Sequence, residues 1–188
     1  DHIFEQTQCS TIFISNDCLD NFIKYYKKYK FSSLKTVVLF DLTLFASDEM
    51  FNKLKELKSF EVLSFKNDLL KDKGSKTELK ISTPETLFTI CYTSGTTNLP
   101  KGAKITQNNF YAGQFSVTES GIQINDTSVH LSYLPLAHIM ERVGLHLMAG
   151  NGALSCFIGG DVKSYLAKDI ALAKPTLLIA VPRVLVMF

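Results

Sequence analysis

The chain has 188 residues, of which 46% are hydrophobic and 20% are charged. This length and balance indicate a globular domain with a hydrophobic core and exclude an intrinsically disordered protein. The 20 basic and 18 acidic residues leave a net charge of +2, so the composition does not predict a nucleic-acid-binding surface, and we expect no nucleic-acid partner.

Apolar, β-branched runs alternate with helical patterns along the first 65 residues. Helices are predicted from about residue 16 and from about residue 47, because apolar residues recur there at the i, i+3, i+4 spacing of an amphipathic helix. The three predicted strands are residues 10–15, 35–40 and 61–65. The middle one is continuously apolar, as in a sheet that is buried on both faces. Residues 66–82 are rich in charges and predict a solvated surface loop.

The alternation resumes after this loop. Helices are predicted from Thr106 or Asn108 to about Gly121, over residues 136–150, and from an Asp161 cap to Pro175. The predicted strands are residues 86–93, 128–134, 153–158 and 176–181. This order predicts an α/β fold of layered parallel or mixed β-sheets flanked by helices.

The scattered cysteines Cys9, Cys18, Cys91 and Cys156 form no Cys-x-x-Cys pair, which favours reduced thiols in an intracellular protein. The most apolar run, residues 176–188, is interrupted by Pro182 and Arg183 and is shorter than the roughly 18 residues of a membrane-spanning helix. The N-terminal segment lacks the pattern of a signal peptide.

Residues 92–104, YTSGTTNLPKGAK, concentrate hydroxyl groups, glycines and lysines directly after a predicted strand. Thr93, Ser94, Thr96 and Thr97 supply hydroxyl donors, and Gly95 allows the backbone to approach an anion closely. Lys101 adds a positive charge between Pro100 and Gly102. The segment predicts an oligophosphate-binding loop, placed where a strand ends and a helix begins, as in open α/β sheets. It lacks two fixed positions of the common P-loop, the second glycine and the Ser/Thr after the lysine, which disfavours an ordinary P-loop NTPase.

The stretch YTSGTTNLPKGAKITQNN resembles the phosphate-binding signature of adenylate-forming enzymes, which include acyl-CoA synthetases, luciferases and peptide-synthetase adenylation domains. The resemblance implies that Thr93, Ser94, Gly95, Thr96, Thr97, Lys101 and Gly102 bind the phosphates of ATP, and that Thr93 also helps to hold Mg²⁺. Asn98 and Gln107 stand where the family usually has glycine and histidine. Asn tolerates positive φ better than other non-glycine residues, so we expect the loop geometry to be retained.

A second block, YLPLAHIMERV at residues 133–143, is similar to the long-chain fatty acyl-CoA synthetase version of the motif that lines the acyl and adenylate site. His138, Glu141 and Arg142 occupy its polar positions, and the resemblance implies a catalytic role for His138 beside Lys101. Residues 157–184, which end in Val-Pro-Arg with Arg183, resemble the same subfamily.

We therefore expect the chain to be a piece, residues 1–188, of the large N-terminal AMP-binding domain of a long-chain fatty acid–CoA ligase. Within it, residues 84–188 would carry the phosphate loop and acyl-site region. It begins without methionine and stops within an apolar run. The resemblance places a Mg²⁺-binding glutamate, a ribose-binding aspartate and a C-terminal-domain lysine beyond it, so the fragment alone should be inactive.

The parent would use ATP, Mg²⁺, CoA and a long-chain fatty acid, in the cytoplasm or at the cytosolic face of a membrane. The alternatives are an enzyme that adenylates an aryl or amino acid, and a non-catalytic binding module that retains the fold.

Overall fold

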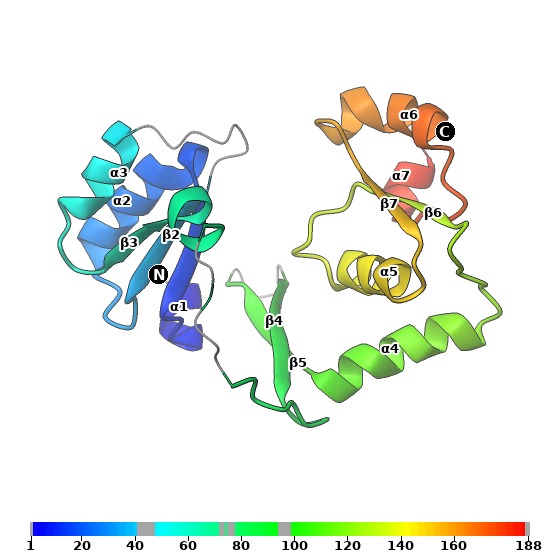
Figure 1. Cartoon of the computed structure of the whole chain (residues 1–188), viewed down its shortest axis with the longest axis horizontal. Helices are drawn as coiled ribbons and strands as arrows, with labels where there is room; N and C mark the ends of the chain where they lie inside the picture. Colours follow the sequence, from blue (N-terminus) through cyan, green and yellow to red (C-terminus); the bar gives the residue numbers. More distant parts are fainter. Residues whose placement is uncertain (1, 41–47, 72–73, 75–77, 94–98, 187–188) are drawn as a thin grey trace. The chain divides into compact units, whose positions relative to one another are not determined.

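The structure is a computed structural model that describes residues 2–40, 48–71, 74, 78–93 and 99–186. The chain divides into two compact units, residues 1–79 and residues 80–188 (Figure 1). The boundary falls within the segment 66–82 for which the sequence predicts a solvated loop. Each unit has its own sheets and its own buried side chains, so the two are described in turn.

The first unit contains a parallel sheet in the order β1-β2-β3. Its elements are α1 (His2–Thr7), β1 (Thr11–Ser15), the 3₁₀ turn η1 (Asn16–Cys18), α2 (Leu19–Tyr29), β2 (Thr36–Phe40), α3 (Asp48–Lys55), β3 (Glu61–Ser64) and the π-helical turn η2 (Phe65–Leu69). The three strands and two helices lie close to their predicted positions. Parallel pairing follows because a helix connects each strand to the next.

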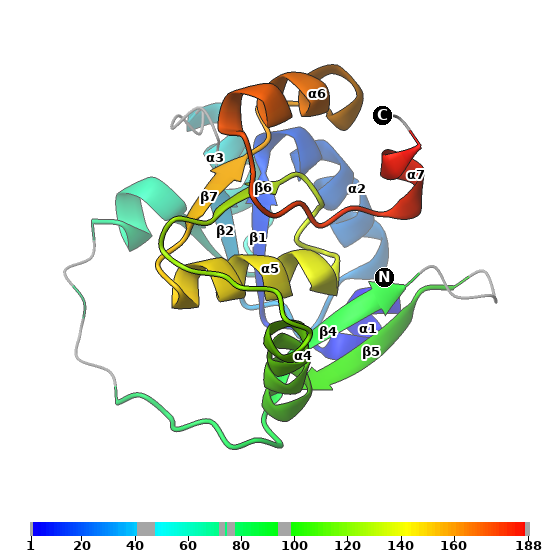
Figure 2. The same ribbon diagram turned by 90° about the vertical axis from the view of Figure 1, so that its right-hand side faces the viewer.

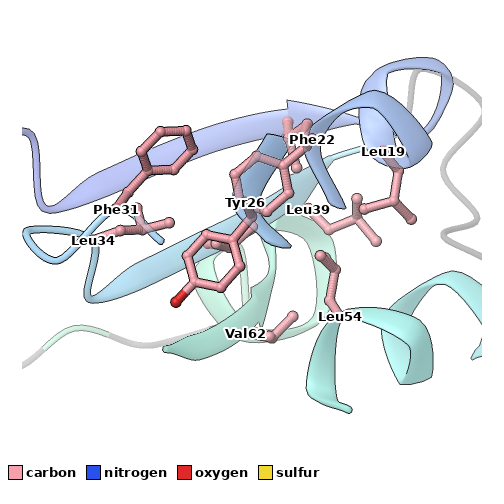
Figure 3. Close-up of a cluster of buried hydrophobic side chains, with 10 residues drawn as sticks. Leu19, Phe22, Tyr26, Phe31, Leu34, Leu39, Leu54 and Val62 are labelled. Atoms are coloured by element: carbon pink, nitrogen blue, oxygen red, sulfur yellow. The ribbon is translucent and has the colours of Figure 1, made fainter. Parts of the chain in front are cut away.

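The core of the first unit lies between the sheet and the apolar faces of α2 and α3. Leu19, Phe22 and Tyr26 on α2 face Leu39 and Val62 of the sheet, and Leu54 on α3 completes the cluster (Figure 3). The i, i+3, i+7 spacing of the α2 residues places them on one side of the helix. Consecutive residues Val37, Val38 and Leu39 of β2 are all buried, which confirms the predicted burial of this strand on both faces.

Two features of the first unit differ from expectation. The short helix α1 was not predicted from sequence; Phe4 on it stacks on Phe31, with ring centroids 4.1 Å apart. The segment 66–82 begins within the π-helical turn η2, where Asn67 N–H donates to Ser64 Oγ. Described residues 78–82 are exposed and lack regular structure, as expected of a solvated loop.

The second unit contains an antiparallel hairpin and a two-stranded parallel sheet. Its elements are β4 (Leu87–Thr93), β5 (Lys101–Thr106), α4 (Gln107–Glu119), β6 (Val129–Ser132), α5 (Ile139–Gly150), β7 (Leu154–Phe157), α6 (Val162–Ala173) and α7 (Pro182–Leu185). The sheets and flanking helices form the layered α/β fold that the sequence predicts.

Helices lie on both sides of the β6–β7 sheet. In both views of the chain this sheet lies between α6 and α5 (Figures 1 and 2). Leu131 of β6 packs with Leu166 of α6, and both are almost fully buried. On the other side, α5 also contacts α4. Phe110 of α4, which stacks on Phe88 of β4 at 4.1 Å, shares a cluster with Val143 and Leu147 of α5. The helix α5 therefore packs against both the parallel sheet and the hairpin with α4.

Two sequence predictions in the second unit are wrong. Residues 101–106 form a strand that was not predicted, because Lys-Gly-Ala-Lys has no alternating apolar pattern and its pairing with β4 determines its conformation. Residues 176–181 form no strand among the described residues, only a bridge between Leu177 and His130. Val129 N–H donates to the Thr176 hydroxyl at 2.9 Å, so a side chain takes part of the hydrogen bonding that a backbone ladder would use.

The N-terminus of α6 is capped as predicted. The Asp161 carboxylate accepts a hydrogen bond from Ser164 N–H at 3.1 Å. The Ser164 hydroxyl, and then the Ser164 backbone N–H, hold the pKa of this carboxyl below its usual value. The helix ends at Ala173, just before Pro175, because proline disfavours helical geometry in the residue that precedes it.

Asp161→Ala is expected to destabilise α6 at neutral pH, because the cap acceptor is lost. A carboxyl group with a lower pKa in the folded protein than in the unfolded chain stabilises the fold at pH values above its ordinary pKa of about 3.9. This stabilisation is lost as the pH falls through the lowered pKa of the folded protein. The difference in melting temperature between the wild type and Asp161→Ala should therefore narrow below about pH 4. Circular dichroism melts from pH 7 to pH 3 measure it. Asp161→Asn, which keeps the acceptor, is the matched control, and a difference that is constant with pH contradicts the assignment.

No helix among the described residues is long and apolar enough to cross a membrane.

Candidate functional site

The predicted phosphate loop lies at the open end of the β4–β5 hairpin. Thr93 and Lys101 form the last pair of the antiparallel ladder, and Thr93 Oγ1 donates to the Lys101 carbonyl at 3.5 Å. Both residues are exposed. Ser94, Gly95, Thr96, Thr97 and Asn98 lie outside the described residues. The hairpin register thus places the predicted Mg²⁺-binding hydroxyl and the predicted phosphate-binding cation beside each other.

The position of this loop in the fold differs from the one that the sequence predicts. A helix was expected to follow the loop directly, as at the carboxyl end of a strand in an open α/β sheet. Instead β5 lies between the loop and α4, and its six residues span about 17 Å at the usual rise per residue. The N-terminus of α4 therefore lies at the opposite end of the hairpin. The positive charge at this end of β5 is that of Lys101, not that of the N-terminus of α4.

Gly102 has a packing reason to be glycine. It lies in the extended strand β5 opposite Tyr92, and a Cβ atom on it would lie 2.8 Å from Ile90 Cγ2 and 3.0 Å from Tyr92 Cζ. Glycine at position 102 thus has a steric role in the hairpin. A larger side chain would displace Tyr92 or Ile90 next to the Thr93–Lys101 pair.

His138 lies at the N-cap of α5. Its backbone N–H donates to Pro135 O at 2.8 Å, which closes the turn 135–138, and its imidazole makes no capping hydrogen bond to the helix. All four residues of the turn are exposed. The side chain is thus at the surface of the second unit.

Glu141 lies in the core, although the motif comparison placed it at a polar position of the site. Its side chain is fully buried, and Oε1 lies 3.1 Å from Nε2 of His130, which is also fully buried. The other ring nitrogen of His130 faces the Leu177 carbonyl at 3.4 Å. Both ring nitrogens of His130 thus face oxygen atoms. The sequence analysis did not single out His130, because the alternation of β6 does not reveal a buried partner on α5.

Tyr133 lies close to this pair at the end of β6. Its side chain is 5% exposed. Burial raises the pKa of its hydroxyl, a backbone N–H of Val181 opposes this effect, and the Glu141 charge adds to it. Glu141 Oε2 is buried and has no hydrogen-bond partner within the described residues. Glu141 thus places one carboxyl oxygen against His130 and the other in a buried position without a described partner.

Arg142, the next residue on α5, bridges two segments that are distant in sequence. Its Nε donates to the Leu136 carbonyl in the turn before the helix, and Nη1 donates to the Thr89 hydroxyl on β4. The side chain is half-buried. Sequence comparison placed Arg142 at a polar position of the site, but Thr89 was not predicted to be its partner.

The described residues contain no group of three or more His, Cys, Asp or Glu side chains that could hold a metal ion. Phosphate oxygens and hydroxyl groups are ligands that Mg²⁺ accepts, and the Thr93 hydroxyl is the described group that the sequence predicts for this role. An exposed hydroxyl and an adjacent exposed lysine fit the binding of a metal–nucleotide complex.

The whole chain, residues 1–188, matches the family described as "AMP-binding enzyme". It is 36% identical over 187 residues to fatty acyl-CoA synthetase B of Dictyostelium discoideum, a match that covers 97% of this chain and 26% of that protein. It is also 36% identical over 128 residues to long-chain-fatty-acid–CoA ligase 1 of Cavia porcellus, covering 66% of this chain and 18% of that protein. The chain thus spans about a quarter or less of the length of these relatives.

Solved structures with the same fold include the adenylation domain of a carboxylate reductase from Mycobacterium chelonae. The TM-score is 0.80 at 22% identity, and the match covers 99% of this chain and 30% of that one. O-succinylbenzoate CoA synthetase from Bacillus subtilis, in complex with ATP and magnesium ion, matches with a TM-score of 0.59 at 20% identity, covering 88% of this chain and 33% of that one. These likenesses establish the adenylate-forming fold.

Proposed function

The chain belongs to the AMP-binding enzyme family, and from this premise we propose that its full-length protein is an ATP-dependent long-chain fatty acid–CoA ligase. The reaction has two steps. The fatty acid carboxylate attacks the α-phosphorus of ATP, which forms the acyl-adenylate and releases pyrophosphate. The CoA thiol then attacks the acyl carbon, which forms the thioester and releases AMP.

The observation that carries this proposal is the hairpin, whose last ladder pair joins Thr93 to Lys101 around the Ser-Gly-Thr-Thr loop. It supports nucleotide binding because the Thr93 hydroxyl and the Lys101 side chain belong to paired, exposed residues at one end of the hairpin. The acyl substrate is supported by the two relatives, whose names specify fatty acyl-CoA and long-chain fatty acid–CoA ligation. ATP and magnesium are supported by the B. subtilis structure that contains both.

The residues of the hairpin would act on the first step. The Lys101 ammonium would neutralise charge on the phosphates that leave as pyrophosphate, and the Thr93 hydroxyl would hold the metal–nucleotide complex. His138 belongs to the second motif and is exposed at the N-cap of α5. From there it would contact the reacting groups of the substrate. Its imidazole can donate a hydrogen bond to the oxygen that joins the acyl group to AMP.

We further propose that the full-length protein works in the cytoplasm or at the cytosolic face of a membrane, where a long-chain fatty acid is available. This placement follows from the chemistry of the substrates: the fatty acid partitions into membranes, whereas ATP and CoA are soluble. The four cysteines are free among the described residues, which suits a reducing compartment.

The proposal is tested by isotope exchange between pyrophosphate and ATP in the purified full-length protein. Exchange should depend on palmitate or oleate, and added CoA should convert the adenylate into acyl-CoA and AMP. Residues 1–188 alone should show no exchange, because the family positions that bind Mg²⁺ and ribose lie further along the sequence. Palmitate-dependent exchange by residues 1–188 contradicts this prediction.

Substrate panels separate the alternatives. Exchange that depends on an aryl or amino acid, and not on a fatty acid, would indicate the sibling adenylating enzymes. Nucleotide binding without exchange for any acid would indicate a non-catalytic module. Either result would overturn the proposed ligase activity.

A further inference from the structure

Among the described residues of α5, only Arg142 has a side chain with recorded hydrogen bonds to both motifs. It bonds to the turn that carries His138 and to the hairpin. Its first partner, the Leu136 carbonyl, lies two residues before His138. Its second partner, the Thr89 hydroxyl, lies four residues before Thr93 on the same strand, a distance of about 13 Å along the chain. One side chain thus connects the two motifs that the proposed reaction uses.

The guanidinium group suits this connection. It is planar and permanently charged, and its N–H donors have a fixed relative geometry. When Nε and Nη1 are both engaged, the Leu136 carbonyl and the Thr89 hydroxyl are held at a fixed separation. A lysine has one compact charge at the end of a flexible chain and cannot reproduce both bonds with this geometry.

The turn needs such a restraint because it has little packing of its own. Residues 135–138 are all exposed, and Leu136 is 53% exposed. By contrast, α5 itself is held by the buried pair of Glu141 with His130 and by Val143 and Leu147 in the cluster with Phe110. Loss of the Arg142 side chain should consequently release the turn while the helix stays in place.

We propose that Arg142 is a positioning residue for the first half-reaction. It holds the turn that carries His138 in a fixed position relative to β4, the strand that leads into the predicted phosphate-binding loop. The expected kinetic effect rests on the proposed function, whereas the expected structural effect on the turn does not. A displacement of the reacting groups by about 1 Å can lower the rate about a hundredfold, so a residue of this kind affects turnover more than nucleotide affinity.

The kinetic test uses the full-length enzyme with Arg142→Ala, Arg142→Lys, Thr89→Val, Thr89→Ser and the double variant Arg142→Ala/Thr89→Val. Arg142→Ala should lower the turnover of acyl-adenylate formation about 10- to 100-fold, the range expected for a charged hydrogen bond. The KM for ATP should stay within about threefold, because the hairpin itself is intact. The burst of acyl-adenylate counts the active sites, so a loss of folded enzyme is separated from a loss of turnover per site.

The Thr89 variants test the bridge. Thr89→Val removes one of the two hydrogen bonds of Arg142 and should lower turnover less than Arg142→Ala does. The double variant should have almost the same turnover as Arg142→Ala alone. Thr89→Ser keeps the hydroxyl and should retain turnover. Asn151→Ala is the matched control, because Asn151 bonds to the Leu147 carbonyl at the opposite end of α5. It should leave turnover per active site unchanged.

Hydrogen exchange tests the same inference without any activity. The His138 amide, which donates to Pro135 O, should exchange at least about tenfold faster in Arg142→Ala, while the amides of α5 from Val143 onward keep their protection. An unchanged His138 amide, unchanged turnover per site, or fully additive effects of the two substitutions would each overturn the positioning role. If the wild-type enzyme shows no fatty acid-dependent exchange between pyrophosphate and ATP, the proposed function is overturned. The hydrogen exchange of the His138 amide would still decide the role of Arg142.

Discussion

Glu141→Ala lowers the free energy of opening the α5–β6 region by about 1–3 kcal/mol, the range seen when a buried hydrogen-bonding group loses its partner. The expectation follows from the complete burial of both Glu141 and His130 and from their 3.1 Å contact. The alanine variant leaves the imidazole without its carboxylate in a region that water does not reach. Hydrogen exchange of the α5 and β6 amides in the full-length protein measures the change.

Two further variants show whether the pair is the cause. Glu119→Ala removes an exposed glutamate from the last turn of α4 and should change the opening free energy by less than about 0.5 kcal/mol. Replacing both partners, as His130→Leu/Glu141→Met, should recover most of the loss because the buried imidazole and carboxyl group are removed together. If Glu141→Ala behaves like Glu119→Ala, the two side chains are not a buried pair in solution.

Lys101→Met slows acyl-adenylate formation about 10- to 150-fold and leaves thioester formation nearly unchanged. A hydrogen bond to a charged group contributes about 1.5–3 kcal/mol, and about 1.4 kcal/mol corresponds to a factor of ten in rate. The selectivity follows from the position of Lys101 beside Thr93 at the open end of the hairpin, where it would contact the phosphates that leave as pyrophosphate. Two assays of the full-length enzyme measure it: pyrophosphate release, and CoA transfer from pre-made acyl-adenylate.

Lys104→Met is the matched control for this substitution. Lys104 is also exposed on β5, but it pairs with Ile90 three positions further from the loop. Its side chain emerges on the opposite face of the strand from that of Lys101, so both half-reactions should proceed at the wild-type rate. Equal losses in the two half-reactions of Lys101→Met would indicate a structural role or a shared step. No loss in either would remove Lys101 from the phosphate site.

Neighbouring residues of α5 have separate tasks in this arrangement. Glu141 points into the core and binds His130 of the parallel sheet, whereas Arg142 points toward the hairpin and binds Thr89. Residues that are adjacent on a helix differ by about 100° in direction, so one helix can contact both sheets of the second unit. The polar residues of the second motif thus have different surroundings: His138 is exposed at the N-cap of α5, Glu141 is buried against His130, and Arg142 connects the turn to the hairpin.

The fold class, the family and most of the elements were predictable from local sequence. The buried strand β2, the apolar face of α2 and the Asp161 cap of α6 were all predicted, because each depends on residues within a few positions of one another. The phosphate motif was recognisable for the same reason, since its hydroxyls, glycine and lysine are contiguous. The conformation of Ser94 to Asn98 remains a prediction.

The surroundings of these motifs depend on contacts between distant parts of the chain. Residues 101–106 became a strand through pairing with β4, and residues 176–181 did not become one because the Thr176 hydroxyl takes part of the hydrogen bonding with Val129. The partners of Glu141 and Arg142 lie 11 and 53 residues away. Local propensity and spacing carry no information about such distant contacts, because they arise only when packing brings α5 against two different strands.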